Sequence, residues 1–383
     1  MDKVRPDQAT DPYGFYRHLR DHEPVCRMEG DGPWQIARHE DVHRILKDFD
    51  TFSSDVSMQP LEERQPSMLF SDPPVHNRLR KLVSYAFKPT HIEAQRTVVE
   101  IRCEELIAEM KQHQSVDLVE TLASPLPVTI IAHMLGVVDG DMKAFKIWSD
   151  TIFSNIGDIL FGVTSEDAQR CAEEMNAYFL ERIAELRVNP VDHLLGRLIQ
   201  TETEDGMLTD EELLSFCRLL LIAGNETTTG LITAAVRVFD EVPETLGQLR
   251  KNPELVPGFI EEALRYYSPF AATIRKTTKD VTIQGTDIKQ GSFVLPLISS
   301  ANRDERVFDR PEAFVIDRHP NPHLAFGFGI HFCLGAYLAR LEGQVAVEQL
   351  VRNFSHISLA TSVGAEEGSG LGGPKNLMVE LKV

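Results

Sequence analysis

The sequence predicts a mainly α (α+β) fold, with long helices in the core and a few short strands in a small β region. Apolar residues recur at helical spacing through most of the middle of the chain. Short strand-like stretches bounded by Gly-rich turns lie towards both ends. The composition, 42% hydrophobic and 25% charged, is that of an ordinary globular protein. The 383 residues contain no repeat and no linker, so we expect a single domain over 1–383.

The N-terminal part predicts helices and strands in alternation. The turn at 29–33, Glu-Gly-Asp-Gly-Pro, separates two strands. A long polar stretch after them is typical of a binding loop. In chain order we expect a helix at about 12–20, strands at 25–28 and 34–37, a helix at 39–49 and an irregular loop at 51–72.

The middle of the chain is expected to be almost entirely helical. Its longest helix, at 209–239, opens at Thr209, and Glu212 three residues later completes a capping box. A helix of that length is roughly 45 Å long and can cross the molecule. The other helices are expected at 74–87, 92–112, 125–136, 140–160, 165–187, 192–201, 244–251 and 253–266.

The C-terminal part predicts a return to β structure around one more helix. Gly285 and Gly291 mark turns within a strand–turn–strand segment. In chain order we expect that segment at 278–296, Pro-rich coil at 307–324, a helix at 334–350, and strands near 355–360 and 377–382.

Charge and cysteine content restrict the partners and the compartment. The net charge of −19 argues against nucleic acid or an anionic membrane as the main partner. The five cysteines are odd in number and scattered, which is typical of a reducing compartment. The polar N-terminus has no apolar signal region, and the most apolar stretch, 219–223, is far shorter than a bilayer span. We therefore expect a soluble, cytoplasmic protein with no membrane and no nucleic-acid partner.

The segment 326–335, Phe-Gly-Phe-Gly-Ile-His-Phe-Cys-Leu-Gly, places Cys333 among glycines directly before an apolar helix. The glycines let the backbone approach a flat molecule, and the helix N-terminus favours thiolate over thiol. A thiolate with one open face suits heme iron as a proximal ligand. Two other interpretations stay open, a buried structural cysteine and a zinc site. The zinc site would use His319, His323, His331 and Cys333, although no C-x-x-C pair accompanies them.

The pattern Phe-Gly-x-Gly-x-His-x-Cys-x-Gly resembles the heme-binding loop of the cytochrome P-450 family. The resemblance covers essentially the whole chain. It implies the family's fold, a helix-rich triangular prism with a small β-sheet region. It also implies a heme b cofactor with Cys333 as the axial ligand of the iron. In this family Phe326 would shield the sulfur and His331 would contact a heme propionate.

Three basic residues elsewhere are further candidates for propionate binding. His76 and Arg80 stand at i and i+4 on a predicted helix, so they share a face and can bracket one anion. By themselves they would be a solvated basic face. The family's His-x-x-x-Arg helix implies instead that they bind heme. Arg275 matches a propionate-binding arginine of the family, and would otherwise be a strand-edge surface residue.

The segment 223–228, Ala-Gly-Asn-Glu-Thr-Thr, lies inside the long helix. Gly224 weakens the helix there and Thr227 can bond back to a carbonyl, so we expect a bulge. By itself the segment is a polar stripe on an ordinary helix. Its similarity to the family's Ala-Gly-x-Glu/Asp-Thr signature implies that Glu226 and Thr227 are catalytic. Thr227 would hydrogen-bond to dioxygen during its reduction, and Glu226 would relay protons.

Glu262 and Arg265 stand at i and i+3 on another helix, a spacing that usually gives a functionally silent ion pair. In the family such a pair is buried and joined by a second arginine. Arg318 stands at that place. The resemblance therefore implies a structural triad that holds the cysteine loop against the core.

The resemblance implies a heme-thiolate monooxygenase that inserts one oxygen atom of O2 into a small apolar organic substrate. The chain has no flavin- or iron–sulfur-binding motif, so a separate ferredoxin or flavodoxin with its reductase would supply electrons. Arg78, Lys81 and Lys88 could form a basic docking patch for it. A peroxide-driven peroxygenase, a heme-thiolate isomerase or dehydratase, and a non-catalytic heme sensor are the alternatives. The segments expected to line the substrate pocket are 51–70, Leu219, Ala223, 270–273, 295–298 and 368–371.

Overall fold

The computed structural model describes residues 11–28, 30–57, 66–137, 141–154, 165–204, 206–360 and 373–383. The N-terminal helices are α1 (Pro12–His22), α2 (His39–Lys47), α3 (Val75–Ser84), α4 (Pro89–Glu93), α5 (Arg96–Met110) and α6 (Pro125–Leu135). The others are α7 (Met142–Ser154), α9 (Glu166–Val188), α10 (Leu194–Gln200), α11 (Asp210–Glu241), α12 (Glu244–Lys251), α13 (Val256–Tyr266), α14 (Ile298–Ala301) and α15 (Ala336–Asn353). One π-helical turn, η2 (Val119–Ala123), and the 3-10 turns η4 (Pro253–Leu255) and η5 (Gly329–His331) complete the helical elements described.

The strands are short. They are β1 (Val25–Arg27), β2 (Trp34–Ile36), β3 (Phe52–Ser53), β4 (Ser115–Asp117), β5 (Glu202–Thr203), β6 (Gly206–Met207), β7 (Arg275–Thr277), β8 (Val281–Ile283), β9 (Thr286–Ile288), β10 (Phe293–Pro296), β11 (His356–Leu359) and β12 (Met378–Lys382). Helices therefore dominate the described chain, as the sequence predicts.

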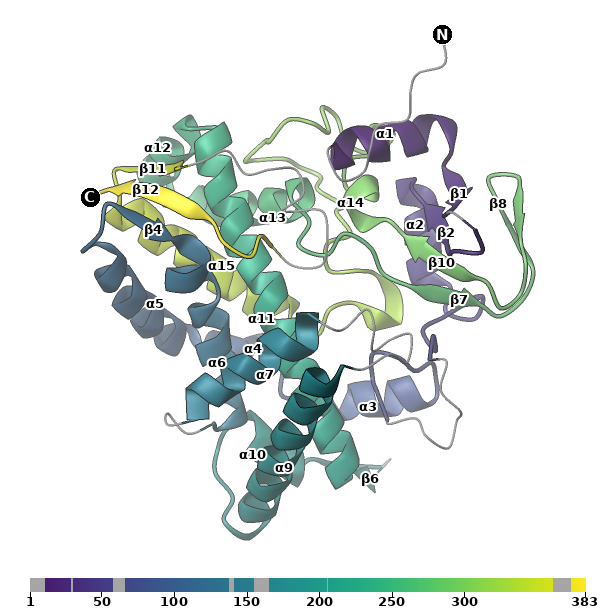
Figure 1. Ribbon diagram of the computed structural model, residues 1–383, viewed down its shortest axis with the longest axis horizontal. Helices are drawn as coiled ribbons and strands as arrows, with labels where there is room; N and C mark the ends of the chain where they lie inside the picture. The colour runs from purple at the N-terminus through teal and green to yellow at the C-terminus, as the bar shows by residue number, and fades with distance from the viewer. Residues whose placement is uncertain are drawn as a thin grey trace. The chain divides into compact units, whose positions relative to one another are not determined.

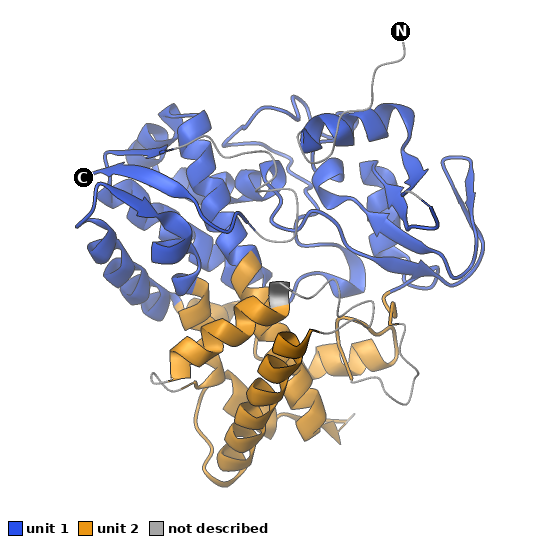
Figure 2. Ribbon diagram, viewed as in Figure 1, with its two compact units in different colours: residues 1–53, 96–126, 227–383 blue, residues 54–95, 127–226 orange. Residues whose placement is uncertain are grey.

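The chain packs into two compact units, each built from separate stretches (Figure 2). Unit 1 contains residues 1–53, 96–126 and 227–383, and unit 2 contains residues 54–95 and 127–226. The boundary at 226/227 falls inside α11. The expectation of a single domain over 1–383 stays a prediction.

The main sheet of unit 1 has the strand order β1-β2-β10-β7-β3. β10 runs parallel to β2, with Val294 opposite Trp34, and the other neighbours are antiparallel. α2 lies against this sheet (Figure 1), and Ile36, Ile45 and Val294 belong to one buried apolar cluster. The sheet thus fixes the position of α2, which matters for the cysteine loop.

A second sheet of unit 1, in the order β11-β12-β4, joins the C-terminal strands to residues 115–117. β4 was not predicted from the sequence, because three residues carry too little alternation to be recognised. The β5–β6 hairpin and β7 were not predicted either. The expected helix at 92–112 is interrupted between Glu93 and Arg96, so that α4 and α5 are separate.

The longest helix, α11, confirms the capping box predicted at its start. The Thr209 backbone N–H donates to Glu212 Oε2 over 2.9 Å, and the Glu212 N–H donates to Thr209 Oγ1 over 3.2 Å. Among the described helices of 18 residues or more, α11 alone has the length and mean hydropathy of a bilayer span. However, 67% of its apolar window is buried, which is the pattern of a core helix.

Candidate active site

Cys333 lies in a short loop between η5 and α15. Its backbone N–H donates to the Phe326 carbonyl oxygen over 2.9 Å. Gly329 has a φ of +74°, and a Cβ there would lie 2.7 Å from the Leu46 carbonyl oxygen of α2, so only glycine fits. Cys333 is exposed and stands three positions before the first residue of α15. Cys333 is therefore an accessible cysteine directly before a helix N-terminus.

One side of the cysteine loop rests on α2. The rings of His43 and Phe328 have centroids 4.0 Å apart. Leu46 and Leu324 belong to the same buried apolar cluster as Ile36 and Val294 of the main sheet. The loop is therefore supported by side chains whose positions the sheet determines.

The other side of the loop is held by α13 through Glu261. Arg340 Nε of α15 donates to Glu261 over 2.7 Å, and His323 Nε2 lies 3.1 Å from the same carboxylate. The Arg340 guanidinium stacks on Phe326 at 4.4 Å from the ring centroid. Burial opposes ionisation, but the Arg340 and His323 hydrogen bonds outweigh it and lower the pKa of Glu261 to about 2.

Next to it, Glu262 is the centre of the predicted buried triad, and the contacts confirm it. Arg265 Nη2 and Nε donate to the Glu262 carboxylate over 2.7 and 2.8 Å, and Arg318 Nε lies 3.0 Å from both oxygens. Asn321 and the Val315 backbone N–H donate to it as well. Glu262 and Arg265 are fully buried, so this network fixes the coil that leads into the cysteine loop.

Arg275 lies on β7, between β10 and β3, and is buried. Its Nη1 donates to the Ile274 carbonyl oxygen over 2.8 Å and to Thr273 Oγ1 over 3.2 Å. The alternative of a strand-edge surface arginine is therefore wrong. His331, also in unit 1, is half-buried at the end of η5.

His76 and Arg80 lie on α3 in unit 2, one turn apart. His76 is buried, with Nδ1 3.2 Å from the Asn77 side-chain oxygen, and Arg80 is half-buried. Burial lowers the pKa of His76, and the Arg80 charge lowers it further. Neither residue is part of an open, solvated basic face.

The segment 223–228 lies in an uninterrupted stretch of α11, so the expected bulge does not break the helix. Gly224 has a different role, because a Cβ there would lie 2.8 Å from the Ile131 side chain of α6. Asn225 is buried and donates to Ser149 Oγ of α7 over 2.7 Å. Ser149 in turn donates to the Leu221 carbonyl oxygen over 3.3 Å. α7 therefore anchors α11 one residue before Glu226, an anchor that the sequence did not reveal.

Glu226 is half-buried on α11 in unit 2. Burial raises its pKa, Asp150 of α7 raises it further, and Lys146 of α7 lowers it. Asp150 and Lys146 form an ion pair of 3.0 Å on their own helix. Thr227, the next residue, is also half-buried. A carboxyl group with a raised pKa beside a hydroxyl is suited to proton delivery.

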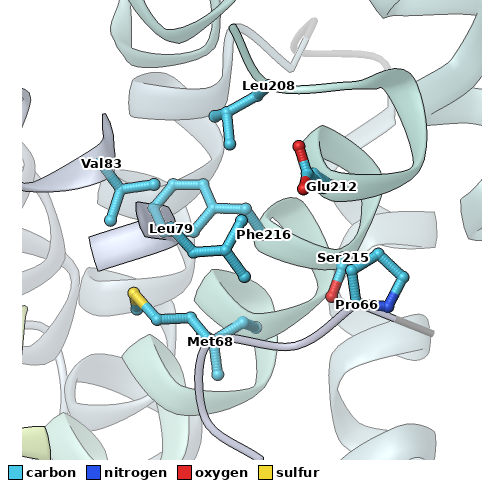
Figure 3. A pocket seen from close by; sticks show the side chains of 9 residues that line it. Pro66, Met68, Leu79, Val83, Leu208, Glu212, Ser215 and Phe216 are labelled. Carbon is cyan, nitrogen blue, oxygen red and sulfur yellow. The ribbon is translucent and has the colours of Figure 1, made fainter. Parts of the chain in front are cut away.

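Unit 2 contains a small apolar pocket between the loop after residue 65, α3 and the start of α11. Its lining residues are Pro66, Met68, Leu79, Val83, Leu208, Glu212, Ser215, Phe216 and Leu219 (Figure 3). The cavity volume is about 10 Å³, at the lower limit for one water molecule. It joins two of the expected lining segments, the 51–70 loop and Leu219, but it cannot hold a substrate as it stands. Residues 58–65 and the expected lining segment 368–371 lie outside the described residues.

Comparison with known proteins identifies the family. The family model described as "Cytochrome P450" matches residues 25–367. The chain is a cytochrome P450. The putative cytochrome P450 YjiB of Bacillus subtilis strain 168 is 39% identical over 97% of this chain and 94% of its own length. The cytochrome P450 monooxygenase PikC of Streptomyces venezuelae is 38% identical over 94% of this chain and 87% of its own.

Solved structures show the same fold. CYP109Q5 of Chondromyces apiculatus matches with a TM-score of 0.90 at 34% identity, over 99% of this chain and 97% of its own. CYP109E1 of Bacillus megaterium, in complex with testosterone, matches with a TM-score of 0.87 at 36% identity, over 97% of this chain and 99% of its own. This P450 therefore has the predicted fold, binds heme b, and is a heme-thiolate monooxygenase of organic substrates.

The loop around Cys333 fits a heme. An exposed sulfur at a helix N-terminus offers one open coordination face. Phe332, beside it, is 38% exposed and offers apolar surface to a flat ring. The zinc alternative has no support, because no three His, Cys, Asp or Glu side chains of the described chain could hold a metal ion. His323 is instead bound to Glu261.

The basic patch expected for a redox partner is not an open cationic surface. Arg78 pairs with Glu212, and Lys81 Nζ lies 2.7 Å from Glu204. Lys88 lies over the Tyr85 ring, 4.1 Å from its centroid. The first two charges are paired within unit 2, and docking of a redox partner at this patch stays a prediction.

Glu261, the first glutamate of the pair 261–262, was not recognised from the sequence. Glu261 attaches both Arg340 and His323 to α13, whereas only Glu262 was recognised. Two successive acidic residues on a helix point in directions about 100° apart, so each can serve a different partner. A basic residue in the helix after the cysteine was the available signal.

Proposed function

We propose that Cys333 is the axial ligand of the heme iron in this monooxygenase. The observation that carries the proposal is an exposed sulfur at the N-terminus of α15, in a loop held from one side by α2 and from the other by α13. The bound heme supplies the activation of dioxygen. Phe326, whose carbonyl oxygen accepts from the Cys333 N–H, would shield the sulfur from water.

Basic residues would hold the propionates. Arg275 and His331 of unit 1, and His76 and Arg80 of unit 2, are buried or half-buried donors. A partly buried carboxylate needs charge-assisted hydrogen bonds of this kind. Single Arg275→Ala and Arg80→Ala variants should weaken heme retention, measured as the heme lost to an acceptor protein over time.

Glu226 and Thr227 would supply protons for dioxygen cleavage. Burial raises the pKa of Glu226, which favours the protonated form that a proton donor requires. Thr227 would hold a hydrogen bond to the oxygen being reduced. The Ser149–Asn225 anchor supports the helix directly before this pair.

We infer that the substrate is an apolar molecule of about steroid size. CYP109E1, 36% identical, has been solved with testosterone and with corticosterone. Leu219 and exposed Ala223 stand one turn apart on α11, an aliphatic surface with no charge. Spin-state titrations should give low-micromolar dissociation constants for steroids. Binding restricted to small polar compounds would contradict the inference.

Electrons would come from a separate ferredoxin or flavodoxin. Near the cysteine loop, α2 carries exposed Arg44 and Lys47, and α15 carries Tyr337, which is 52% exposed. An acidic electron carrier could dock on this basic and aromatic surface of unit 1. We also propose that the enzyme works in the cytoplasm, in keeping with its bacterial relatives and its buried α11.

The direct test of this function compares two oxidants. With O2 and a ferredoxin–reductase pair, the wild-type enzyme should oxidise a bound steroid, and Glu226→Gln should lose most of that activity. With hydrogen peroxide, the same variant should lose little. If the enzyme turns over only with peroxide, and neither the ferredoxin–reductase pair nor the Glu226→Gln change alters its rate, it is instead a peroxygenase.

A further inference from the structure

Glu342 is a buried carboxyl group that the proposed chemistry leaves without a role. It lies on α15, nine positions after Cys333, and is 1% exposed. Its Oε1 atom has no hydrogen-bond partner, and Glu342 has no ion pair among the residues that the structure describes. Unpaired buried carboxylates are costly, so a structural reason is needed for an acidic residue at this place.

α15 is tightly packed against apolar side chains at the residue that follows Glu342. At Gly343, next to it, a Cβ would lie 2.8 Å from Leu231 of α11 and 3.2 Å from Ile260 of α13. One polar side chain acts on the carboxyl group, the buried Thr228 hydroxyl of α11, through a hydrogen bond. Thr228 directly follows Thr227. α15, which begins after the Cys333 loop, is thus joined to α11, which carries Thr227.

Several charged groups on α13, α5, α12 and α15 are bound to other partners. On α13, Glu261 binds Arg340 and Glu262 binds Arg265. On α5, Glu104 accepts from Gln349, and on α12 Arg250 donates to the Val351 carbonyl oxygen. On α15 itself, Glu348 interacts with Arg352 and with Arg96 of α5.

No charged group is among the influences on the Glu342 pKa. Burial raises it to about 8, and only the Thr228 hydrogen bond opposes that rise. The group is therefore predominantly a neutral acid at pH 7. A neutral acid can keep its bond to a hydroxyl without the desolvation cost of a charge.

We propose that Glu342 is a neutral positioning residue, whose bond to Thr228 fixes the Thr227 segment of α11 against α15 and thereby keeps oxygen reduction coupled to substrate oxidation. This inference rests on the proposed role of Thr227. The positioning role requires a neutral hydrogen-bonding group at position 342. It does not require Glu342 to release a proton.

The first test detects the proton on the heme-loaded protein without turnover. Infrared difference spectra of wild type minus Glu342→Gln should contain the carbonyl stretch of a protonated carboxylic acid at pH 7, and this band should weaken as the pH rises past about 8. Absence of the band at pH 7 would overturn the proposal. Glu348→Gln, on the same helix but half-exposed, is the matched control and should not remove the band.

The second test measures coupling as the ratio of oxidised product to hydrogen peroxide released. Glu342→Gln keeps a neutral hydrogen-bonding group and should retain wild-type coupling within about twofold. Glu342→Leu and Thr228→Val remove opposite ends of the same hydrogen bond. Each should therefore reduce coupling about three- to tenfold, which is the size of effect expected from the loss of one hydrogen bond. The double variant should be no worse than either single one.

The outcomes separate this inference from the function on which it rests. If Thr227→Ala uncouples the enzyme but Glu342→Leu and Thr228→Val do not, the positioning role is wrong and the proposed function stands. If Glu342→Gln uncouples as strongly as Glu342→Leu, Glu342 is a proton donor and the proposal fails. If Thr227→Ala itself has no effect, the role of Thr227 is wrong.

Discussion

At the scale of single residues, the surroundings of a side chain decide its chemistry. Glu226 and Glu261 are both partly buried glutamates, yet their pKa values shift in opposite directions. Burial dominates at Glu226. At Glu261, hydrogen bonds from Arg340 and His323 outweigh burial. The first residue is suited to carry a proton, and the second to hold a permanent charge.

The charges on α7 should tune the pH profile of turnover. Glu226 must be protonated to donate, so activity should fall as the pH rises through its pKa. Asp150→Asn removes a charge that raises this pKa, so the alkaline limb of the profile should move to lower pH. Lys146→Gln removes a charge that lowers it, so the limb should move up. Shifts in the same direction for both variants would contradict the role of Glu226.

Thr227→Ala should lower product formation about tenfold or more while oxygen consumption continues, because the hydrogen bond that directs proton delivery is lost. The missing oxygen should be recovered as hydrogen peroxide. Thr227→Ser restores a hydroxyl group and should recover most of the coupling. Full coupling in the alanine variant would exclude a catalytic hydroxyl at this position.

At the scale of elements, the cysteine loop derives its position from helices distant in sequence. α2 supports it through His43 and Leu46, and α13 supports it through Glu261 and Glu262. The loop itself needs glycine at 329, where α2 approaches most closely. Heme binding should therefore depend on residues that never touch the heme.

Glu262→Ala should leave Arg265 buried without its partner, which costs about 3–5 kcal/mol of unfolding free energy. The variant should fold poorly and retain little heme, measured by thermal unfolding and by heme absorbance per protein. The neighbouring Glu261→Ala is the control. Its carboxylate is partly exposed, so the loss should be nearer 1–2 kcal/mol. Full heme loading of a soluble Glu262→Ala protein would contradict the structural role of the triad.

The sequence predicted most helices because their apolar spacing and caps are local signals, as at Thr209 and Glu212. It missed β4 and β7, which contain three residues each and exist only through pairing with distant strands. The Glu262 triad was recognised by resemblance, since a spacing of three does not reveal burial. The roles of Gly224 and Asn225 were not recoverable, because both depend on side chains of other helices, Ile131 and Ser149.

At the scale of the whole molecule, electron supply has to be reconciled with a net charge of −19. An acidic ferredoxin would be repelled by the protein as a whole, so docking requires a local basic surface. In the patch expected around Arg78 and Lys81, both of these charges form ion pairs with glutamates. Arg44 and Lys47 on α2, next to the cysteine loop, are the better candidates.

The double substitution Arg44→Glu and Lys47→Glu should slow reduction by ferredoxin about tenfold or more at low salt, and the difference should shrink as the ionic strength rises. Stopped-flow reduction under carbon monoxide measures this rate. The double control Lys279→Glu and Lys289→Glu, on either side of the β8–β9 hairpin, changes the net charge by the same amount and should change this rate little. If both variants slow reduction equally, the rate responds to net charge, and α2 does not carry a docking surface.

The most direct measurement is the absorption spectrum of the reduced protein under carbon monoxide. Thiolate ligation by Cys333 predicts the long-wavelength Soret band typical of heme-thiolate proteins, and Cys333→His should replace it with the shorter-wavelength band of a histidine-ligated heme. A wild-type protein that gives the histidine-type band, or a Cys333→Ala variant that keeps the thiolate-type band, would contradict the assignment of Cys333.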